Sequence, residues 1–206
     1  MRRMPPYSVV MATADQRPMR ADARENRDRL LRAAGERFAL DGPDVPLEAI
    51  ARSAGVGIGT LYRHFPDRAA LIEAVYRSEV DQLCAAGPVL LSQRPAADAL
   101  AEWMERFVTY AARKRALLAV LRSTTGAQSD VSPSARERLL AAIGEILQAG
   151  IDAGELRPDV DSQDVFASMN AVWLISGGGE DWAAQTERVL RLLMDGLRFG
   201  AAAGGG

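Results

Sequence analysis

Residues 55–71 read GVGIGTLYRHFPDRAAL, and this stretch decides the fold. Immediately before it, apolar residues from Leu47 to Ala54 recur at the spacing of one face of a short helix. Gly55 ends that helix, because glycine adopts the left-handed backbone conformation at little cost. A second short helix carries Leu61 and runs up to Pro66. Two short helices joined by a glycine-containing turn pack at roughly 90–120° as a helix-turn-helix.

The second helix of this pair is predicted to be exposed on one side. The small Ala51 lets the two helices approach each other, while Val56 and Leu61 fill the angle between them. An exposed helix of this kind fits a DNA major groove, which is about 12 Å wide. Its outward side chains are donors suited to phosphate oxygens and base edges: Thr60, Tyr62, Arg63 and His64. The spacing also occurs in helical bundles, so by itself it leaves DNA binding and bundle packing both open.

Arg68 stands in the first turn of the helix that follows Pro66-Asp67. A cation at this position opposes the helix dipole by ~0.3–1 kcal/mol. A bound anion, such as a DNA phosphate, reverses that penalty. The alternative is that Arg68 is simply solvated and the penalty is screened.

The helix-turn-helix is expected to be preceded by one longer helix. Residues 1–20 contain three prolines and no sustained period, which predicts a flexible arm, and Met11 is an alternative start. Asp22 and Glu25 form a capping-box pattern that opens the helix, which ends before Gly42.

Beyond the helix-turn-helix the pattern is helical throughout. A long helix is predicted to end at about Ala86, with Gly87-Pro88 as the joint between two modules. No β alternation of useful length occurs, so we expect an all-α fold of about nine helices. The predicted segments are an arm (1–20), a three-helix domain that contains the helix-turn-helix (21–86), a larger helical domain (87–200) and a flexible tail (201–206); the resemblance given below implies that the second is a DNA-binding domain and the third a regulatory and dimerisation domain.

Charge and composition are those of an ordinary globular protein. The chain has 206 residues, 25 Lys plus Arg and 27 Asp plus Glu, and 48% of its residues are hydrophobic. Residues 1–77 carry 13 Arg and 10 acids, whereas residues 78–206 carry 12 basic and 17 acidic residues. This asymmetry is compatible with a polyanion partner for the first part, but three charges also fall within chance. No stretch resembles a membrane span or a signal-peptide core, so we expect a cytoplasmic protein without membrane contact.

Catalytic, metal and cofactor chemistry have little support. His64 is the single histidine and Cys84 the single cysteine, so no multi-histidine or cysteine-rich metal site is expected. Cys84, in an apolar helix, is interpreted as a packing residue rather than a redox sensor. Glu102 and Glu105 flank an apolar pair on a solvated helix face and do not form a carboxylate dyad. We therefore predict a protein that is not an enzyme, with no cofactor and no metal.

The stretch from Gly55 to Leu71, within residues 23–80, closely resembles the DNA-binding domain of the TetR family of bacterial transcriptional regulators. The resemblance implies backbone contacts from Thr60, Tyr62, His64 and Arg68. The expected DNA interface comprises Gly57, Gly59, Thr60, Tyr62, Arg63, His64 and Arg68. This sequence has Arg68 where the family usually has Lys, which preserves a phosphate contact. It has Pro46 where the family often has Thr, which removes a hydroxyl contact.

Residues 88–206 resemble the family's regulatory domain in length and pattern. The resemblance implies a homodimer formed through the last two helices, with apolar surface from Val165, Val172, Ile175, Val189, Leu190, Leu193, Met194 and Leu197. It also implies an unknown small-molecule effector. Candidate ligand-binding residues are Trp103, Phe107, Tyr110, Leu118, Leu147, Phe166, Met169 and Trp173.

The sequence therefore predicts a repressor that a small molecule releases from a double-stranded, pseudo-palindromic operator. The alternative is a helical ligand-binding or scaffold protein whose DNA-reading motif is vestigial.

Overall fold

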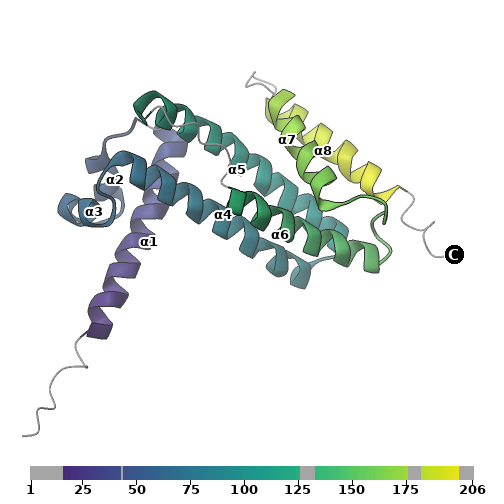
Figure 1. Ribbon diagram of the computed structural model, residues 1–206, viewed down its shortest axis with the longest axis horizontal. Coiled ribbons are helices and arrows are strands. Elements are labelled where there is room, and N and C mark those ends of the chain that lie inside the picture. The colour runs from purple at the N-terminus through teal and green to yellow at the C-terminus, as the bar shows by residue number, and fades with distance from the viewer. Residues whose placement is uncertain (1–15, 43, 126–132, 176–181, 200–206) are drawn as a thin grey trace, which may run out of the picture.

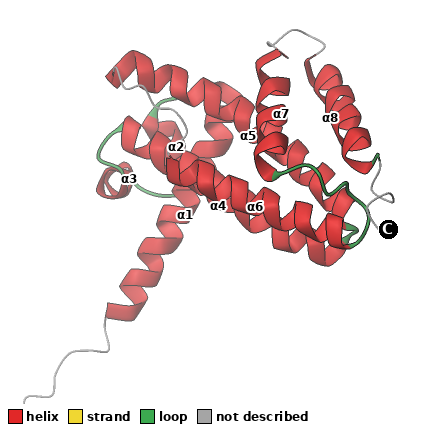
Figure 2. Ribbon diagram, turned by 45° about the vertical axis from the view of Figure 1, so that its right-hand side comes forward, coloured by secondary structure: helices red, strands yellow, loops and turns green. Residues whose placement is uncertain are grey.

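The computed structural model describes residues 16–42, 44–125, 133–175 and 182–199, and these residues form eight helices and no strand (Figures 1 and 2). The helices are α1 (Gln16–Asp41), α2 (Leu47–Ser53), α3 (Ile58–His64), α4 (Arg68–Gln93), α5 (Ala96–Thr125), α6 (Pro133–Asp152), α7 (Ser162–Ile175) and α8 (Trp182–Arg198). The predicted all-α class is confirmed. The predicted count of about nine is close to the eight helices of the described residues.

Two hydrophobic cores divide the molecule. The smaller core joins α1, α2 and α3 to the first turns of α4, and its fully buried side chains include Leu30, Ile50 and Leu61. The larger core begins at Val80, further along α4, and extends through α5 to α8. Each buried Leu or Ile side chain contributes ~1.5–3 kcal/mol through removal of apolar surface from water. Helix α4 belongs to both cores and therefore connects the two halves.

Helix α4 does not end at Ala86, so the helix boundary predicted at Gly87-Pro88 is wrong. Gly87 is buried, and a Cβ built on it would lie 3.4 Å from Cδ1 of Ile146 in α6. Gly87 therefore allows α6 to pack closely on α4, and it does not end the helix. Pro88 is exposed within the helix, and the buried packing of Gly87 and Leu90 overrides the local tendency to stop.

Helix α1 begins at Gln16, not at the predicted capping box, so Asp22 and Glu25 lie inside the helix. Pro18 lies in the first turn, where the missing N–H has no intrahelical partner in any case. The predicted flexible arm is thus wrong for residues 16–20, and residues 1–15 lie outside the described residues. The predicted end before Gly42, which has a φ of 82°, is confirmed.

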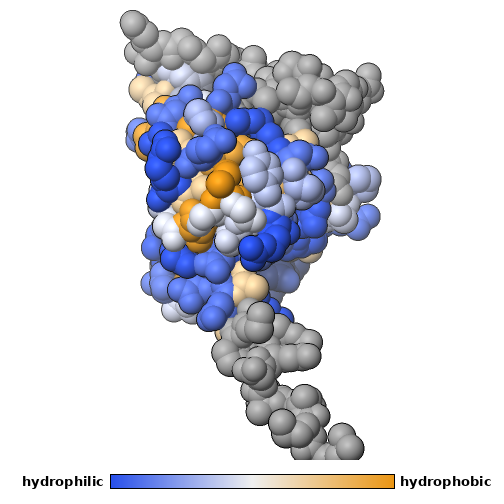
Figure 3. Space-filling model, turned by 90° about the vertical axis from the view of Figure 1, so that its left-hand side faces the viewer, coloured by the Kyte–Doolittle hydropathy of each residue, from blue (hydrophilic) through white to orange (hydrophobic). Residues whose placement is uncertain are grey.

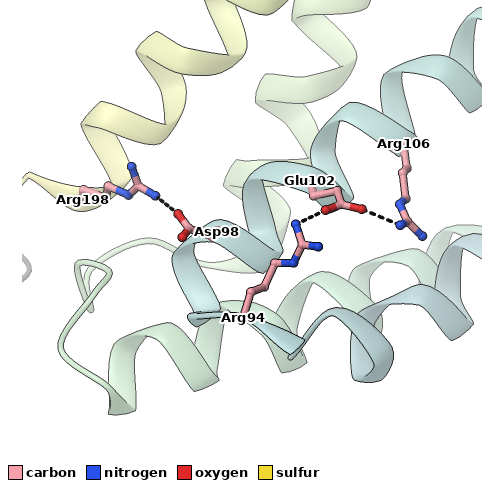
Figure 4. A network of polar contacts seen from close by, with 5 residues as sticks. All are labelled: Arg94, Asp98, Glu102, Arg106 and Arg198. Atoms are coloured by element: carbon pink, nitrogen blue, oxygen red, sulfur yellow. Dashed lines mark hydrogen bonds and ion pairs between the residues drawn. The ribbon is translucent and has the colours of Figure 1, made fainter. Parts of the chain in front are cut away.

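Helices α7 and α8 lie at the end of the molecule opposite α2 and α3 (Figures 1 and 2). Asp161 caps the start of α7, because its carboxylate accepts hydrogen bonds from the backbone N–H groups of Gln163 and Asp164. The C-terminal end of α8 is tied to α5 by an ion pair between Arg198 and Asp98, with an N–O distance of 2.6 Å (Figure 4).

A second ion-pair group lies beside that contact, where Glu102 bridges Arg94 and Arg106 (Figure 4). The loop after α6 reaches the same end of the molecule. Its Glu155 carboxylate accepts a hydrogen bond of 2.8 Å from the backbone N–H of Ala97, in the first turn of α5. The Arg198–Asp98 pair thus joins α8 to α5, whereas the other contacts hold the start of α5 to the end of α4 and to the loop after α6.

None of the helices in the described part of the chain combines the length and the apolar character that a membrane span requires.

Candidate DNA interface

The α2–α3 pair forms the predicted helix-turn-helix. Gly55 adopts a φ of 67°, in the left-handed region that favours glycine, so this residue makes the turn as expected. The turn is held by a hydrogen bond of 3.0 Å from the Val56 N–H to the Ala51 carbonyl. Leu61 is completely buried, and Phe65 is almost so. Helix α3 is therefore anchored along one side.

The opposite side of α3 is open to solvent. Gly57, Gly59, Tyr62 and Arg63 are exposed, and the Tyr62 side chain retains 47% of its accessible surface. Thr60, His64 and Arg68 are half-buried at its edges. Figure 3 shows this end of the molecule, where hydrophilic side chains surround a small hydrophobic patch. The structure thus brings all seven predicted DNA-contact residues to α3 and its junction with α4.

The folded chain itself does not demand glycine at two of these positions. A Cβ built on Gly57 or Gly59 would meet no heavy atom within 4 Å. Gly57, which precedes the first residue of α3, has a φ of −70°, a value that any residue adopts. The missing side chains therefore leave free space on the outer side of α3, where another molecule's backbone can approach closely.

Two contacts that the sequence did not predict hold this surface in place. The Arg27 guanidinium, from α1, lies over the Phe65 ring with its Cζ 5.0 Å from the ring centroid. Such a contact supplies about 0.5–2 kcal/mol and ties α1 to the end of α3. The Asp67 carboxylate caps α4 by accepting a 2.7 Å hydrogen bond from the Ala70 N–H. Its negative charge also offsets the unfavourable position of Arg68 in the first turn.

The predicted ligand-binding residues occupy the larger core. Trp103, Phe107 and Phe166 pack ring against ring, with centroid separations of 5.8 Å and 5.6 Å along the series. Leu147 and Met169 are buried beside them. Of the predicted set, Tyr110 also lines a cleft between α1, α4 and α5. The side chains of Leu118 and Trp173 lie outside the described residues.

The residues predicted for the dimer contact divide into two groups. Several side chains are buried within the chain itself: Val165, Val172, Leu190, Met194 and Leu197. Val189 and Leu193 are half-buried, and they line a groove of about 490 Å³ between α7 and α8. Leu192, which the sequence did not single out, lines the same groove and is 71% exposed. The side chain of Ile175 lies outside the described residues.

The described ranges contain His, Cys, Asp and Glu side chains, which are the usual protein ligands of metal ions. No group of three or more His, Cys, Asp or Glu side chains there is placed to hold a metal ion.

Both halves of the chain match known families. Residues 30–75 match the family of bacterial regulatory proteins called tetR, and residues 95–199 match the SbtR-like C-terminal domain of transcriptional regulators. An HTH-type transcriptional regulator of Staphylococcus aureus (strain USA300) is 41% identical over 64 residues. That match covers 31% of this chain and only 35% of the relative, so it is confined to about a third of each protein.

Solved structures extend the similarity over most of the chain. The TetR transcriptional regulator SCO0520 from Streptomyces coelicolor is 45% identical with a TM-score of 0.75, and the match covers 84% of this chain and 98% of that one. The TetR transcription regulatory protein from Mycobacterium vanbaalenii is 38% identical with a TM-score of 0.71, covering 88% and 99%. Because both domains and the whole fold match, the chain belongs to the TetR family of bacterial transcriptional regulators.

Proposed function

We propose that this TetR-family regulator is a homodimeric repressor that acts in the cytoplasm and inserts α3 into the major groove of a pseudo-palindromic operator. The observation that carries the proposal is the two-sided character of α3. Leu61 fixes one side in the core, while the other side carries exposed donors and two glycines with open space beside them. A rigid, polar surface with open space beside two glycines suits close contact with a phosphate backbone.

The proposed contacts follow the placement of each residue. The hydroxyls of Thr60 and Tyr62, the His64 imidazole and the guanidinium groups of Arg63 and Arg68 supply donors for phosphate oxygens and base edges. Gly57 and Gly59 let the DNA backbone approach α3.

The proposed dimer forms through α7 and α8. Leu192 and the half-buried Val189 and Leu193 give this pair an apolar outer surface around the groove. In a two-fold dimer, the α3 helices would read successive major grooves about 34–36 Å apart. An exposed leucine in an apolar groove is stabilised when a second copy covers it.

The effector is proposed to be a small molecule that binds the regulatory domain. Such a ligand releases the operator only if it binds the DNA-incompetent arrangement better than the competent one. The aromatic cluster around Phe107 is the proposed apolar part of its site, as predicted for Trp103, Phe107, Tyr110, Leu118, Leu147, Phe166, Met169 and Trp173.

Selection of genomic fragments by the purified protein tests the function directly. The selected fragments should share a pseudo-palindrome, and Tyr62→Phe and His64→Ala should weaken binding to it while the protein stays folded. Arg68→Ala should lower the slope of log K against log salt by about 1. Arg77→Ala, an exposed α4 position paired with Glu73, is the matched control and should leave binding unchanged. Failure to retain any fragment would contradict the proposal. It would favour the alternative of a helical ligand-binding or scaffold protein whose DNA-reading motif is vestigial.

A further inference from the structure

A cleft of about 340 Å³ lies where α1 crosses α4 and α5. Its wall on the α1 side includes Leu31 and Gly35, its α4 side includes Val75 and Glu79, and its α5 side includes Tyr110 and Arg113. This volume is at the small end of the range of ligand sites, about 300–1,000 Å³. The cleft shares Tyr110 with the aromatic cluster around Phe107, and it spans the junction of the two cores.

Glu79 is a largely buried carboxylate of this cleft. Its side chain is only 14% exposed, and its Oε1 pairs with Nη1 of Arg113 at 3.3 Å. That distance is long for a charge-assisted contact, for which about 2.7–2.9 Å is usual. Its Oε2 is buried and has no hydrogen-bond partner among the described residues. Burial raises the pKa of this carboxyl, although Arg113 acts in the opposite direction. The site therefore lacks a donor for one carboxylate oxygen.

The surroundings of Glu79 favour a donor that carries both positive charge and apolar surface. Val75 and Leu83 provide apolar walls, and Tyr110 provides an aromatic one. Burial raises the pKa of the Tyr110 phenol, which is therefore neutral and can accept a hydrogen bond at ordinary pH. The rings of Tyr76 and Tyr110 pack against each other with their centroids 6.0 Å apart, and burial raises the pKa of both phenols.

Of the three arginines that line the cleft, Arg32 is exposed on α1, and the other two are already paired with carboxylates. Arg106 is bound to Glu102, and Arg113 is bound to Glu79, so both guanidinium groups already face a carboxylate. Their side chains are 49% and 42% exposed, which places them at the rim in contact with water. An anion deep in the cleft would meet the Glu79 carboxylate, whereas a cation there would be attracted by it.

We propose that this cleft is an effector site for a small organic ammonium ion with an apolar body, whose charged end is held by Glu79. The ammonium group would donate to the Glu79 Oε2, which has no partner among the described residues, while Arg113 stays beside Oε1. The apolar body would then lie against Val75, Leu83 and the Tyr110 ring.

Helix α1 connects the cleft to the DNA-binding surface, so a ligand bound in the cleft can affect that surface. Helix α1 forms one wall, and Arg27 of the same helix lies over Phe65 at the end of α3. A ligand that separates α1 from α4 and α5 therefore shifts α3 within each half of the dimer. This coupling rests on the proposed function, whereas binding in the cleft does not. By linkage, operator DNA must weaken ligand binding by the same factor.

Calorimetry with the full-length protein and no DNA tests the site. The probes are benzylamine, benzyl alcohol as its uncharged counterpart, and benzoate as an anion of similar size. Benzylamine should bind with one site per chain, and the other two should bind at least about 10-fold more weakly, because they cannot pair with the carboxylate. Absence of benzylamine binding at millimolar concentration, or equal binding of all three probes, would overturn the proposal.

Two variants locate the binding. Glu79→Gln should weaken benzylamine binding about 10–100-fold. Glu73→Gln, at an exposed position on the same helix outside the cleft lining, is the matched control and should bind as the wild type does. Gly35→Leu fills the cleft from α1; the first carbon of a side chain there would lie 3.8 Å from Cγ1 of Val75, an ordinary contact. Its circular dichroism should be unchanged and its benzylamine binding lost. Retained binding in Glu79→Gln or Gly35→Leu would place the ligand elsewhere.

The regulatory step is tested separately on a selected operator. Saturating benzylamine should weaken operator binding severalfold in the wild type and leave Glu79→Gln unaffected. If the amine binds the cleft but operator affinity does not change, the effector role is overturned while the cleft remains a binding site. If no operator is found, the proposed function fails and the calorimetric result stands independently.

Discussion

The indole Nε1 of Trp103, on α5, donates a hydrogen bond of 2.9 Å to the backbone carbonyl of Leu83, on α4. Trp103 is completely buried, and the contact lies within the larger core. Leu83 precedes Gly87-Pro88 by about one turn of the helix. The bond therefore holds α4 against α5 next to the part of α4 where the sequence favours a break.

Trp103→Phe should lower the free energy of unfolding by about 1–3 kcal/mol, since it removes a buried hydrogen bond and leaves a small void. Urea denaturation monitored by circular dichroism measures the change. Trp182→Phe is the control, because Trp182 is only half-buried, and its loss should be smaller. Equal losses for the two variants would show that the Trp103 bond adds nothing beyond indole packing.

Gly150→Ala should also destabilise the protein by about 1–3 kcal/mol, for a steric reason. A Cβ on Gly150 would lie 2.4 Å from Cδ1 of Leu156, whose side chain is almost fully buried and cannot move away freely. Gly196→Ala is the matched control in α8. Nothing lies within 4 Å of its Cβ position, and alanine there should raise stability by ~0.5–1 kcal/mol. Thermal unfolding of both variants checks the opposite signs.

Local chemistry made the helix-turn-helix predictable from the sequence. The turn at Gly55 depends on a backbone conformation that glycine adopts most readily, and the buried position of Leu61 follows from helical spacing. The prediction that α4 ends at Gly87-Pro88 is wrong because Gly87 packs against Ile146, 59 residues further along the chain. Such a long-range contact leaves no signal in the local sequence. The start of α1 was missed because the residues from Gln16 to Ala21 carry no apolar repeat.

The α1–α4–α5 cleft was not predicted, because its walls come from three separated segments. One signal was nevertheless present: Glu79 lies four residues after Val75 and four before Leu83, so it shares their inward-facing side of α4. An acidic residue in an apolar helix stripe indicates a buried carboxylate. Its pairing with Arg113 and the unpaired Oε2 required the tertiary arrangement.

Cys84 should react slowly with iodoacetamide in the native protein. Burial raises the pKa of its thiol, and Asp81 and Glu145 act in the same direction against Arg138. A raised thiol pKa means a smaller thiolate fraction at a given pH, so the alkylation rate should rise at higher pH than for an ordinary cysteine. Because the chain has one cysteine, the urea-unfolded protein is the reference. Equal pH midpoints in the two states would contradict the expectation.

Leu192→Glu should convert the proposed dimer to monomers at micromolar concentration. The substitution places a charge in the α7–α8 groove, where the partner would otherwise cover an apolar side chain. Sedimentation or light scattering measures the mass. Leu40→Glu is the control, because Leu40 is equally apolar and 80% exposed but lies on α1. A Leu192→Glu protein that keeps the mass of a dimer would exclude this groove as the interface.

Gly59→Ala should raise the stability of the protein and at the same time weaken its binding to DNA. Glycine inside a helix costs ~0.5–1 kcal/mol relative to alanine, and no atom within 4 Å opposes a Cβ at position 59. The variant should therefore unfold at a higher temperature than the wild type. If the outer side of α3 contacts DNA closely, the added methyl group should nevertheless weaken operator binding, as measured by fluorescence anisotropy. Gly144→Ala, at a position in α6 where a Cβ would make an ordinary 3.9 Å contact with Cβ of Ser162, should gain similar stability without losing affinity. A Gly59→Ala protein that is both more stable and equally tight on DNA would mean that the open space beside α3 is not filled by the operator.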